Sequence, residues 1–152
     1  MSKIIDKGST LTVLAEQEIP GLDTATVTGV IDGDTIQVNV NGSEVDVRLL
    51  LIDSPEIAHY DNPTEPHGSD AIAFASRVLA GKTVQLEYDG PKYDTYGRLL
   101  AYVWVSGKMF NQMLLEEGLA HVAYVIDPPY KYYDKYLLAQ TRGKNAVKGI
   151  WG

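Results

Sequence analysis

The sequence predicts an α+β fold in which five short strands form a partly open barrel and about three helices pack around it. Three observations lead to this prediction. Apolar residues follow strand-like patterns in five separate runs. Two of the turns between these runs contain Asp-Gly or Asn-Gly, the strongest short-range signals for a hairpin. Helical patterns are inserted after the third run and again after the fifth.

The chain is long enough for one domain with its own core. It has 152 residues, of which 45% are hydrophobic and 22% are charged, an ordinary globular composition. No apolar run approaches the ~18 residues of a membrane span, so we expect none. Residues 1–23 lack the features of a signal peptide, and we expect a flexible N-terminal extension there and a folded domain over 24–152.

The first half of the folded region predicts a three-stranded meander. We expect strands at Thr24–Ile31, Thr35–Val40 and Glu44–Ile52, with Asn41-Gly42 as the second turn. The following stretch, "SPEIAHYDNPTEPHG", is polar, carries three prolines and has no periodicity. It predicts a loop long enough to need a functional or flexible explanation.

The second half predicts two more strands and three helices. In "SDAIAFASRVLAG" the apolar residues share one helical face, Ser69 can cap the start, and Gly81 can close the end. "KTVQLEY" and "LLAYVWV" are read as the fourth and fifth strands. Helices are expected at 111–117, ending before Gly118, and at 132–145, where clustered tyrosines favour core packing. This arrangement is typical of the OB fold, which names no function by itself.

Composition excludes several kinds of site. The chain has no cysteine, which excludes disulfides, thiolate chemistry and cysteine-bound zinc. Its three histidines do not have the spacing of a helical zinc site, so any metal should be a hard cation such as calcium or magnesium. The net charge of −7 argues against broad attraction to phosphate backbones. The lysines and arginines between 131 and 148 could form a solvated helix face or face phosphate.

Acidic residues cluster around two predicted turns. In "VIDGDTIQV" the turn itself explains Asp32, but not Asp34. The segment "DSPE", at the end of a predicted strand, contributes two more acids, Asp53 and Glu56. Asp34, Asp53 and Glu56 either converge on one hard cation, assisted by a backbone carbonyl, or are scattered surface acids.

Two arginines stand at unusual places in apolar strands. Alternation in "EVDVRLLLIDSPE" puts Arg48 among large apolar neighbours, where a desolvated guanidinium needs a carboxylate or phosphate partner. A side chain that snorkels at the sheet edge is the alternative. Arg98 opens the strand in "DTYGRLLAYVWV", where one arginine alone could form a structural ion pair. Two arginines with a carboxylate cluster match phosphodiester chemistry, because cations neutralise non-bridging oxygens and a carboxylate orients water.

With these residues assembled, the chain resembles the staphylococcal nuclease family. "IDGDT", "VRLLLIDSPE", "DTYGRLLAYVW" and "EEGLAHVAYV" are similar to its signature segments, in order, over about residues 25–151. The resemblance implies a calcium-dependent phosphodiesterase that hydrolyses DNA and RNA with little sequence selectivity and leaves 3′-phosphate ends. The alternative is a non-catalytic OB-fold module that binds nucleic acid or protein, which the retained acids and arginines do not favour.

The resemblance also implies a calcium site. Its ligands would be Asp34, Asp53 and the main-chain carbonyl of Ser54, with Asp32 left as the turn acid. The family usually has threonine where Ser54 stands. That difference should be tolerated, because the ligand atom belongs to the backbone.

Catalytic and substrate-binding roles follow from the same resemblance. Glu56 resembles the proposed general base, and Arg48 and Arg98 resemble the arginines that bind the scissile phosphate. Tyr96 and Tyr124 match tyrosines that line the nucleotide site. The implied partners are single-stranded DNA and RNA, with duplex DNA as a further candidate, for a monomer that is secreted or at the cell surface.

The chain departs from the best-known member at several positions. The loop after Glu56 has no lysine or arginine and carries Asp61 and Glu65. Thr95 replaces a lysine, and Ile126 replaces a further tyrosine. We therefore expect a weaker electrostatic attraction to the polymer and an affinity that depends more on tyrosine stacking.

Overall fold

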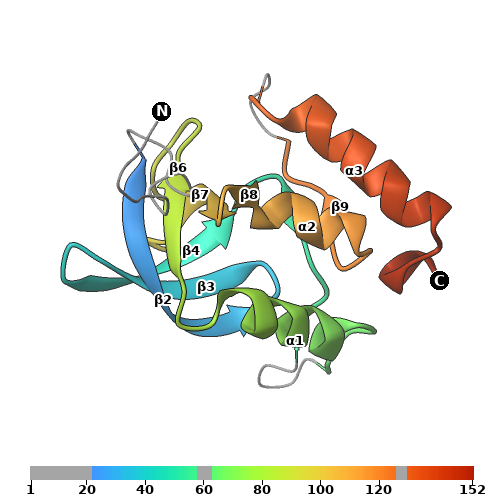
Figure 1. Ribbon diagram of the computed structural model, residues 1–152, viewed down its shortest axis with the longest axis horizontal. Helices are drawn as coiled ribbons and strands as arrows, with labels where there is room; N and C mark the ends of the chain where they lie inside the picture. The colour runs from blue at the N-terminus through green and yellow to red at the C-terminus, as the bar shows by residue number, and fades with distance from the viewer. Residues whose placement is uncertain (1–21, 58–62, 126–129) are drawn as a thin grey trace, which may run out of the picture.

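In the computed structural model, which describes residues 22–57, 63–125 and 130–152, five of the described strands close into a barrel (Figure 1). Antiparallel pairs join neighbouring strands, and a parallel pair of β4 with β7 closes the circle. These strands are β2 (Asp23–Asp32), β3 (Thr35–Val40), β4 (Ser43–Leu49), β6 (Thr83–Glu87) and β7 (Leu99–Val105). The predicted α+β, OB-like barrel is confirmed. Residues 1–21, most of the expected N-terminal extension, lie outside the described residues.

The closing pair of strands brings distant parts of the chain together. Val47, Arg48 and Leu49 of β4 lie beside Leu99, Leu100 and Ala101 of β7, respectively. Arg48 therefore lies next to Leu100 and near Arg98, which immediately precedes β7.

One predicted strand is wrong in its length. The run expected over 44–52 divides into β4, which ends at Leu49, and β5 (Ile52–Asp53). Leu51 between them has φ 66°, a left-handed conformation that a continuous strand does not accommodate. β5 leaves the barrel and pairs with β9 (His121–Val122), while β8 (Lys108–Met109) pairs with the end of β7.

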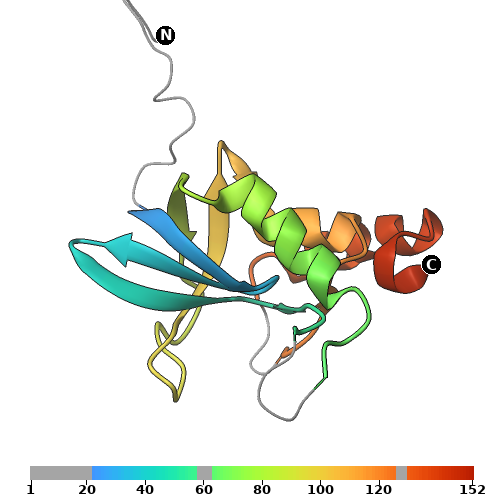
Figure 2. The same cartoon turned by 90° about the horizontal axis from the view of Figure 1, so that it is seen from below.

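Three α-helices are found in the described residues, as predicted. They are α1 (Gly68–Leu79), α2 (Phe110–Glu116) and α3 (Tyr133–Asn145), and a 3-10 turn follows at Gly149–Trp151. The predicted Ser69 cap is wrong, because the helix already begins at Gly68. His67, in a left-handed conformation, occupies the N-cap position, and its side chain makes no capping hydrogen bond within the described part of the chain. Figures 1 and 2 place α2 between the barrel and α3.

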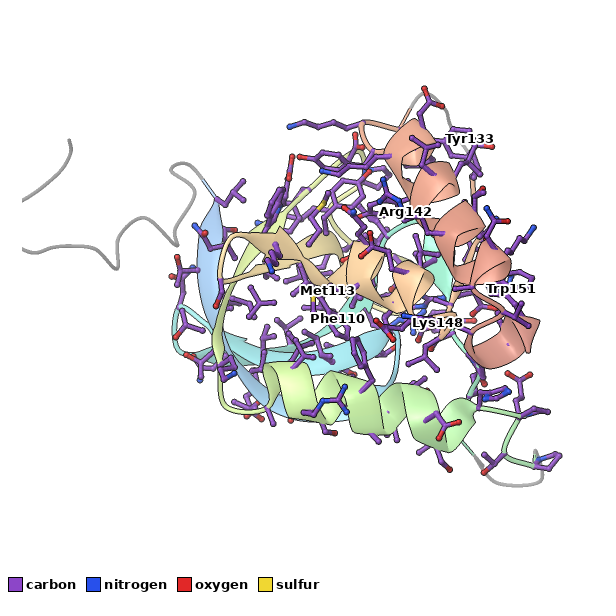
Figure 3. All side chains as sticks on the ribbon, turned by 45° about the vertical axis from the view of Figure 1, so that its right-hand side comes forward. Phe110, Met113, Tyr133, Arg142, Lys148 and Trp151 are labelled. Carbon is purple, nitrogen blue, oxygen red and sulfur yellow. The ribbon has the colours of Figure 1, made fainter. Side chains whose placement is uncertain are left out.

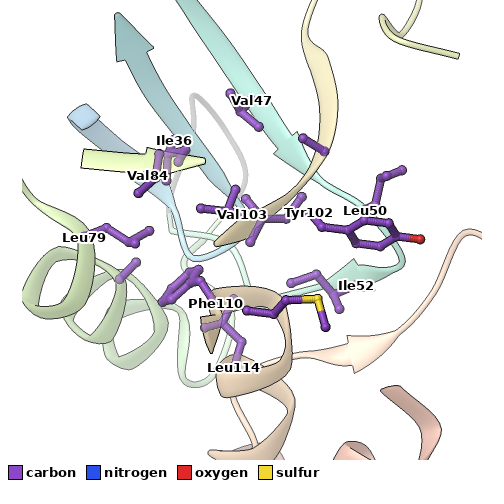
Figure 4. Packing of buried hydrophobic residues seen from close by; sticks show 14 of the residues in the cluster. Ile36, Val47, Leu50, Ile52, Leu79, Val84, Tyr102, Val103, Phe110 and Leu114 are labelled. Atoms are coloured by element: carbon purple, nitrogen blue, oxygen red, sulfur yellow. The ribbon is translucent and has the colours of Figure 1, made fainter. Parts of the chain in front are cut away.

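The core lies inside the barrel and extends under α1 and α2. Figure 4 shows buried side chains from strands and helices meeting there, among them Ile36, Val47, Leu79, Val84, Val103, Phe110 and Leu114. Tyr136 of α3 is fully buried, as its predicted core position requires, and packs edge-on against Tyr102. None of the described helices is long and apolar enough to cross a membrane.

Candidate active site

A cavity of about 480 Å³ opens beside the seam between β4 and β7. Its lining includes Arg48, Glu56, Tyr96, Arg98 and Tyr124. The side chains expected to serve catalysis and substrate binding thus meet at one concave site, although they come from three separate parts of the chain.

Arg48 is held against carboxylates, which is the first of the two alternatives for this residue. Its Nη2 lies 3.2 Å from Oδ2 of Asp34 and 3.3 Å from Oδ1 of Asp53. Its Nη1 donates to the carbonyl oxygens of Leu49 and Ile52 at 2.9 and 3.0 Å. The side chain is only 14% exposed, so the turn between β4 and β5 wraps around a partnered guanidinium rather than a snorkelling one.

Asp34 is fixed by its neighbours. It is 3% exposed. Its Oδ1 accepts a hydrogen bond from Oγ1 of Thr35 at 3.1 Å, and its Oδ2 accepts one from the amide of Ser54 at 2.9 Å. The preceding Gly33 leaves room for this contact, because a Cβ there would lie 2.8 Å from Oγ of Ser54 and 2.7 Å from Cβ of Ala71.

Asp53 stands close to a second negative charge. Burial and the neighbouring carboxylate of Asp34 raise the pKa of Asp53, while Arg48 and His121 act in the opposite direction. His121 lies opposite Asp53 in the pair of β5 with β9. Two adjacent carboxylates, one of them with a raised pKa, form an arrangement that a cation would stabilise.

The donors around this pair fit a hard cation. Asp34 and Asp53 supply carboxylate oxygens, and Ser54 is buried with its hydroxyl lacking a hydrogen-bond partner among the described residues. Oxygen donors of this kind suit calcium or magnesium. Within 22–57, 63–125 and 130–152, no group of three or more histidine, aspartate or glutamate side chains is arranged to hold a metal. The convergence of a third carboxylate, Glu56, which was one of the two alternatives for these acids, is therefore not found among the described residues.

Glu56 is exposed at the cavity, and its backbone is tightly held. Its amide donates to Oε1 of Glu65 at 2.9 Å, and its carbonyl accepts from the amide of Glu65 at 2.8 Å. A Cβ on Gly68 would lie 2.5 Å from the same carbonyl oxygen. Asp32, which the sequence assigns to the turn alone, also accepts a hydrogen bond from the amide of Ile57 at 3.2 Å.

Arg98 is oriented by an aspartate that the sequence analysis missed. Asp94 accepts a hydrogen bond from Nε of Arg98 at 2.7 Å and from the amides of Tyr96 and Arg98, both at 2.9 Å. Burial would raise the pKa of Asp94, but these hydrogen bonds lower it below its usual value. The sequence did contain a signal for this contact, because Asp94 stands four residues before Arg98 in a turn that contains a glycine.

Each arginine also contacts a tyrosine ring. The guanidinium carbon of Arg48 lies 5.4 Å from the ring centre of Tyr124, and that of Arg98 lies 5.5 Å from the ring centre of Tyr96. These are cation–π distances. Tyr96 is 84% exposed and Tyr124 is 60% exposed, so both rings remain accessible beside a positive charge.

The cationic residues near the C-terminus are engaged elsewhere. Figure 3 shows Arg142, Lys148 and Trp151 on α3 and the segment that follows it. Lysines and arginines of this region have intramolecular partners, among them Lys131 with Glu87 (2.7 Å), Arg142 with Glu116 (3.1 Å), Lys148 with Glu117 (3.5 Å) and Lys144 over the ring of Trp151 (4.8 Å). None of the four lines the cavity. The arrangement favours the solvated helix face over the phosphate-facing role.

Several known proteins to which this chain is similar are described as nucleases. The model of the family described as staphylococcal nuclease homologue matches residues 46–152. A thermonuclease from Staphylococcus hyicus is 42% identical over 122 residues, which cover 80% of this chain and 72% of that protein. The endonuclease YncB of Bacillus subtilis (strain 168) is 45% identical over 122 residues, or 80% of this chain and 58% of the relative. In the same strain, the prophage-derived endonuclease YokF is 44% identical, with 41% of its length matched. The matches thus span less than two thirds of both Bacillus relatives.

Proposed function

Since this chain belongs to the staphylococcal nuclease family and is a nuclease by that relationship, we propose that it is a calcium-dependent phosphodiesterase. It hydrolyses DNA and RNA with little sequence selectivity and leaves 3′-phosphate ends. The observation that carries the proposal is the single cavity in which Arg48, Glu56 and Arg98 meet, beside the pair of Asp34 and Asp53.

Calcium would be held by Asp34, Asp53 and the main-chain carbonyl of Ser54. The raised pKa of Asp53 beside Asp34 supports a cation at this place, as does the buried hydroxyl of Ser54, which has no hydrogen-bond partner among the described residues. When bound, calcium supplies positive charge that polarises the phosphate and nearby water. The residues described below bind and orient the substrate.

The two arginines bind the scissile phosphate in this proposal. Arg48 is held in place by the carbonyl oxygens of Leu49 and Ile52, and Arg98 by Asp94 through Nε. Guanidinium groups that are already oriented can stabilise the charge on the non-bridging oxygens as it grows in the transition state. Little reorganisation is then needed during the reaction.

Glu56 accepts a proton from the attacking water or orients that water toward phosphorus. Tyr96 and Tyr124 offer exposed ring faces on which bases of a flexible strand can stack. We therefore propose single-stranded DNA and RNA as the substrates, with duplex DNA as a further one, for a monomer acting outside the cell or at its surface.

The decisive test compares the wild-type chain with Glu56→Gln on single-stranded DNA in calcium, in magnesium and in chelator. We expect cleavage that requires calcium and falls by orders of magnitude in the variant, with an unchanged circular dichroism spectrum. Glu44→Gln, at an exposed position near the start of β4, is the matched control. Binding without cleavage in the wild type would instead support the non-catalytic OB-fold module.

A further inference from the structure

The short segment 54–57, which carries Glu56, is surrounded by carboxylates that accept hydrogen bonds from its backbone amides. The amide of Ser54 donates to Asp34, that of Glu56 to Glu65, and that of Ile57 to Asp32. Asp34 is one of the two carboxylates proposed to hold calcium. The other two acids have no function so far, although they contact the backbone on either side of the proposed catalytic carboxylate.

We propose that Asp32 and Glu65 are positioning residues for Glu56: they clamp the two peptide planes that flank it and so orient its side chain in the cavity. This inference rests on the proposed function of Glu56. It assigns neither acid a direct contact with substrate.

The clamp acts on both planes. A peptide unit is rigid, so the direction of a side chain follows from the two planes that meet at its Cα. The plane before Glu56 is held at its amide by Oε1 of Glu65, at 2.9 Å. The plane after it is held at the carbonyl by the amide of Glu65, at 2.8 Å, and at the next amide, that of Ile57, by Asp32, at 3.2 Å.

The anchors themselves are supported by the fold. Asp32 is the last residue of β2 and is buried. Glu65 lies just before α1, and its carbonyl accepts a hydrogen bond from the amide of Gly68, the first residue of that helix. Gly68 in turn approaches the carbonyl of Glu56 so closely that a Cβ would collide with it. A strand end and a helix start thus hold the segment between them.

Orientation matters because Glu56 is itself exposed. Hydrogen bonds to ionised acceptors are about twice as strong as those between neutral groups. A displacement of about 1 Å in a catalytic group can reduce the rate by 10²-fold. Two carboxylate anchors on adjacent amides therefore favour a defined position for a side chain that packing alone does not confine.

A purely surface role for Glu65 predicts a different result. A carboxylate beside a phosphate-binding cavity repels a polyanion. If Glu65 did nothing else, its removal would lower KM and leave kcat unchanged. A positioning role predicts that kcat falls instead, because the bound substrate then meets a misplaced carboxylate.

The test compares Glu65→Ala, Glu65→Gln and the control Glu44→Ala in calcium on single-stranded DNA. Glu65→Ala should lower kcat by about tenfold to 10²-fold with KM unchanged or lower. Glu65→Gln retains an acceptor oxygen and should restore most of kcat. Hydrogen exchange at the Glu56 amide, measured without substrate, should be slow in the wild type and Glu65→Gln and fast in Glu65→Ala.

A kcat near the wild-type value in Glu65→Ala, together with fast exchange at Glu56, would overturn the positioning role alone. A wild-type chain that does not cleave would overturn the proposed function, and the positioning role with it. The two failures are distinguishable because only the second concerns the wild type.

The same logic applies to Asp32 through the pair Asp32→Ala and Asp32→Asn, with exchange at the Ile57 amide as the structural measurement. Because Asp32 is two residues from Asp34, kcat is measured at saturating calcium after the calcium affinity of each variant has been determined by calorimetry. A fall in kcat for Asp32→Ala that Asp32→Asn reverses supports the proposal. An unchanged kcat in Asp32→Ala overturns it for this residue.

Discussion

Arg48 and Arg98 line the same cavity but are built into the molecule in different ways. Arg48 donates to two backbone carbonyls and lies against two carboxylates. Arg98 makes its ion pair within its own turn, with Asp94. Arg48 therefore stabilises the barrel as well as lining the site, whereas the ion pair of Arg98 stabilises only a local turn.

Replacing each arginine by lysine should separate these two contributions. Both Arg48→Lys and Arg98→Lys should lower kcat/KM by about 10²–10³-fold, on the scale of a lost electrostatic donor. Only Arg48→Lys should also lower the Tm by several degrees, because a single ammonium cannot replace the planar guanidinium toward Leu49, Ile52 and both aspartates. Cleavage kinetics and thermal unfolding measure the two effects. Equal losses of Tm in both variants would contradict this distinction.

At the scale of elements, a polar network attaches the start of α3 to the barrel. Glu87 of β6 accepts hydrogen bonds from Nε1 of Trp104 (2.8 Å), Nζ of Lys131 (2.7 Å) and the hydroxyl of Tyr132 (2.9 Å). Burial would raise the pKa of Glu87, but these three donors lower it below its ordinary value. The network holds the segment that leads from the cavity, through Tyr130, into α3.

Glu87→Gln should therefore destabilise the protein in a pH-dependent way. A carboxyl whose pKa is lower in the folded state stabilises that state above its ordinary pKa of 4.5, and this contribution is lost as the pH falls through the folded-state pKa. We expect a loss of about 1–3 kcal/mol in the free energy of unfolding at pH 7 and a smaller difference in acid. Urea unfolding at both pH values measures it, with Glu44→Gln as the control. A loss of unfolding free energy that is the same at both pH values would contradict a lowered pKa of Glu87 in the folded state.

Predictions from the sequence succeeded where the signal was local. Strand-like runs of apolar residues predicted β3 and β7 with their observed bounds, and Gly118, which has φ 67°, follows the end of α2 closely. The break between β4 and β5 was missed because Leu51 adopts a positive φ without the glycine that would announce it. The hydrogen bond between Asp32 and Ile57 joins residues far apart in the chain, and no local pattern indicates it.

At the scale of the whole molecule, electrostatics should contribute little to polymer binding. The net charge is −7, and Lys131, Arg142, Lys144 and Lys148 have intramolecular partners away from the cavity. Among the residues that the structure describes, Arg48 and Arg98 are the cations that line the cavity. Affinity for a single strand should depend more on the exposed rings of Tyr96 and Tyr124 than on charge.

The salt dependence of binding measures this directly. Two phosphate contacts to a single strand predict a slope of about −1.4 for log K against log salt, at about 0.7 per contact. Glu56→Gln in calcium permits the measurement without cleavage. Lys144→Ala should leave the slope unchanged. A slope steeper than about −3 would mean that the cations of the C-terminal region contact the strand as well.

The parallel pair of β4 with β7 also has a consequence for synthesis. A nascent chain that has not yet emerged as far as β7 already carries Asp34, Arg48, Asp53 and Glu56, but it lacks Arg98 and the strand beside which Arg48 lies. Closing the barrel joins segments distant in sequence, which carries an entropic cost that only the completed contacts repay. Hydrolytic competence should therefore arise late and abruptly, when the last barrel strand docks, so that an unfinished chain on the ribosome does not yet cleave.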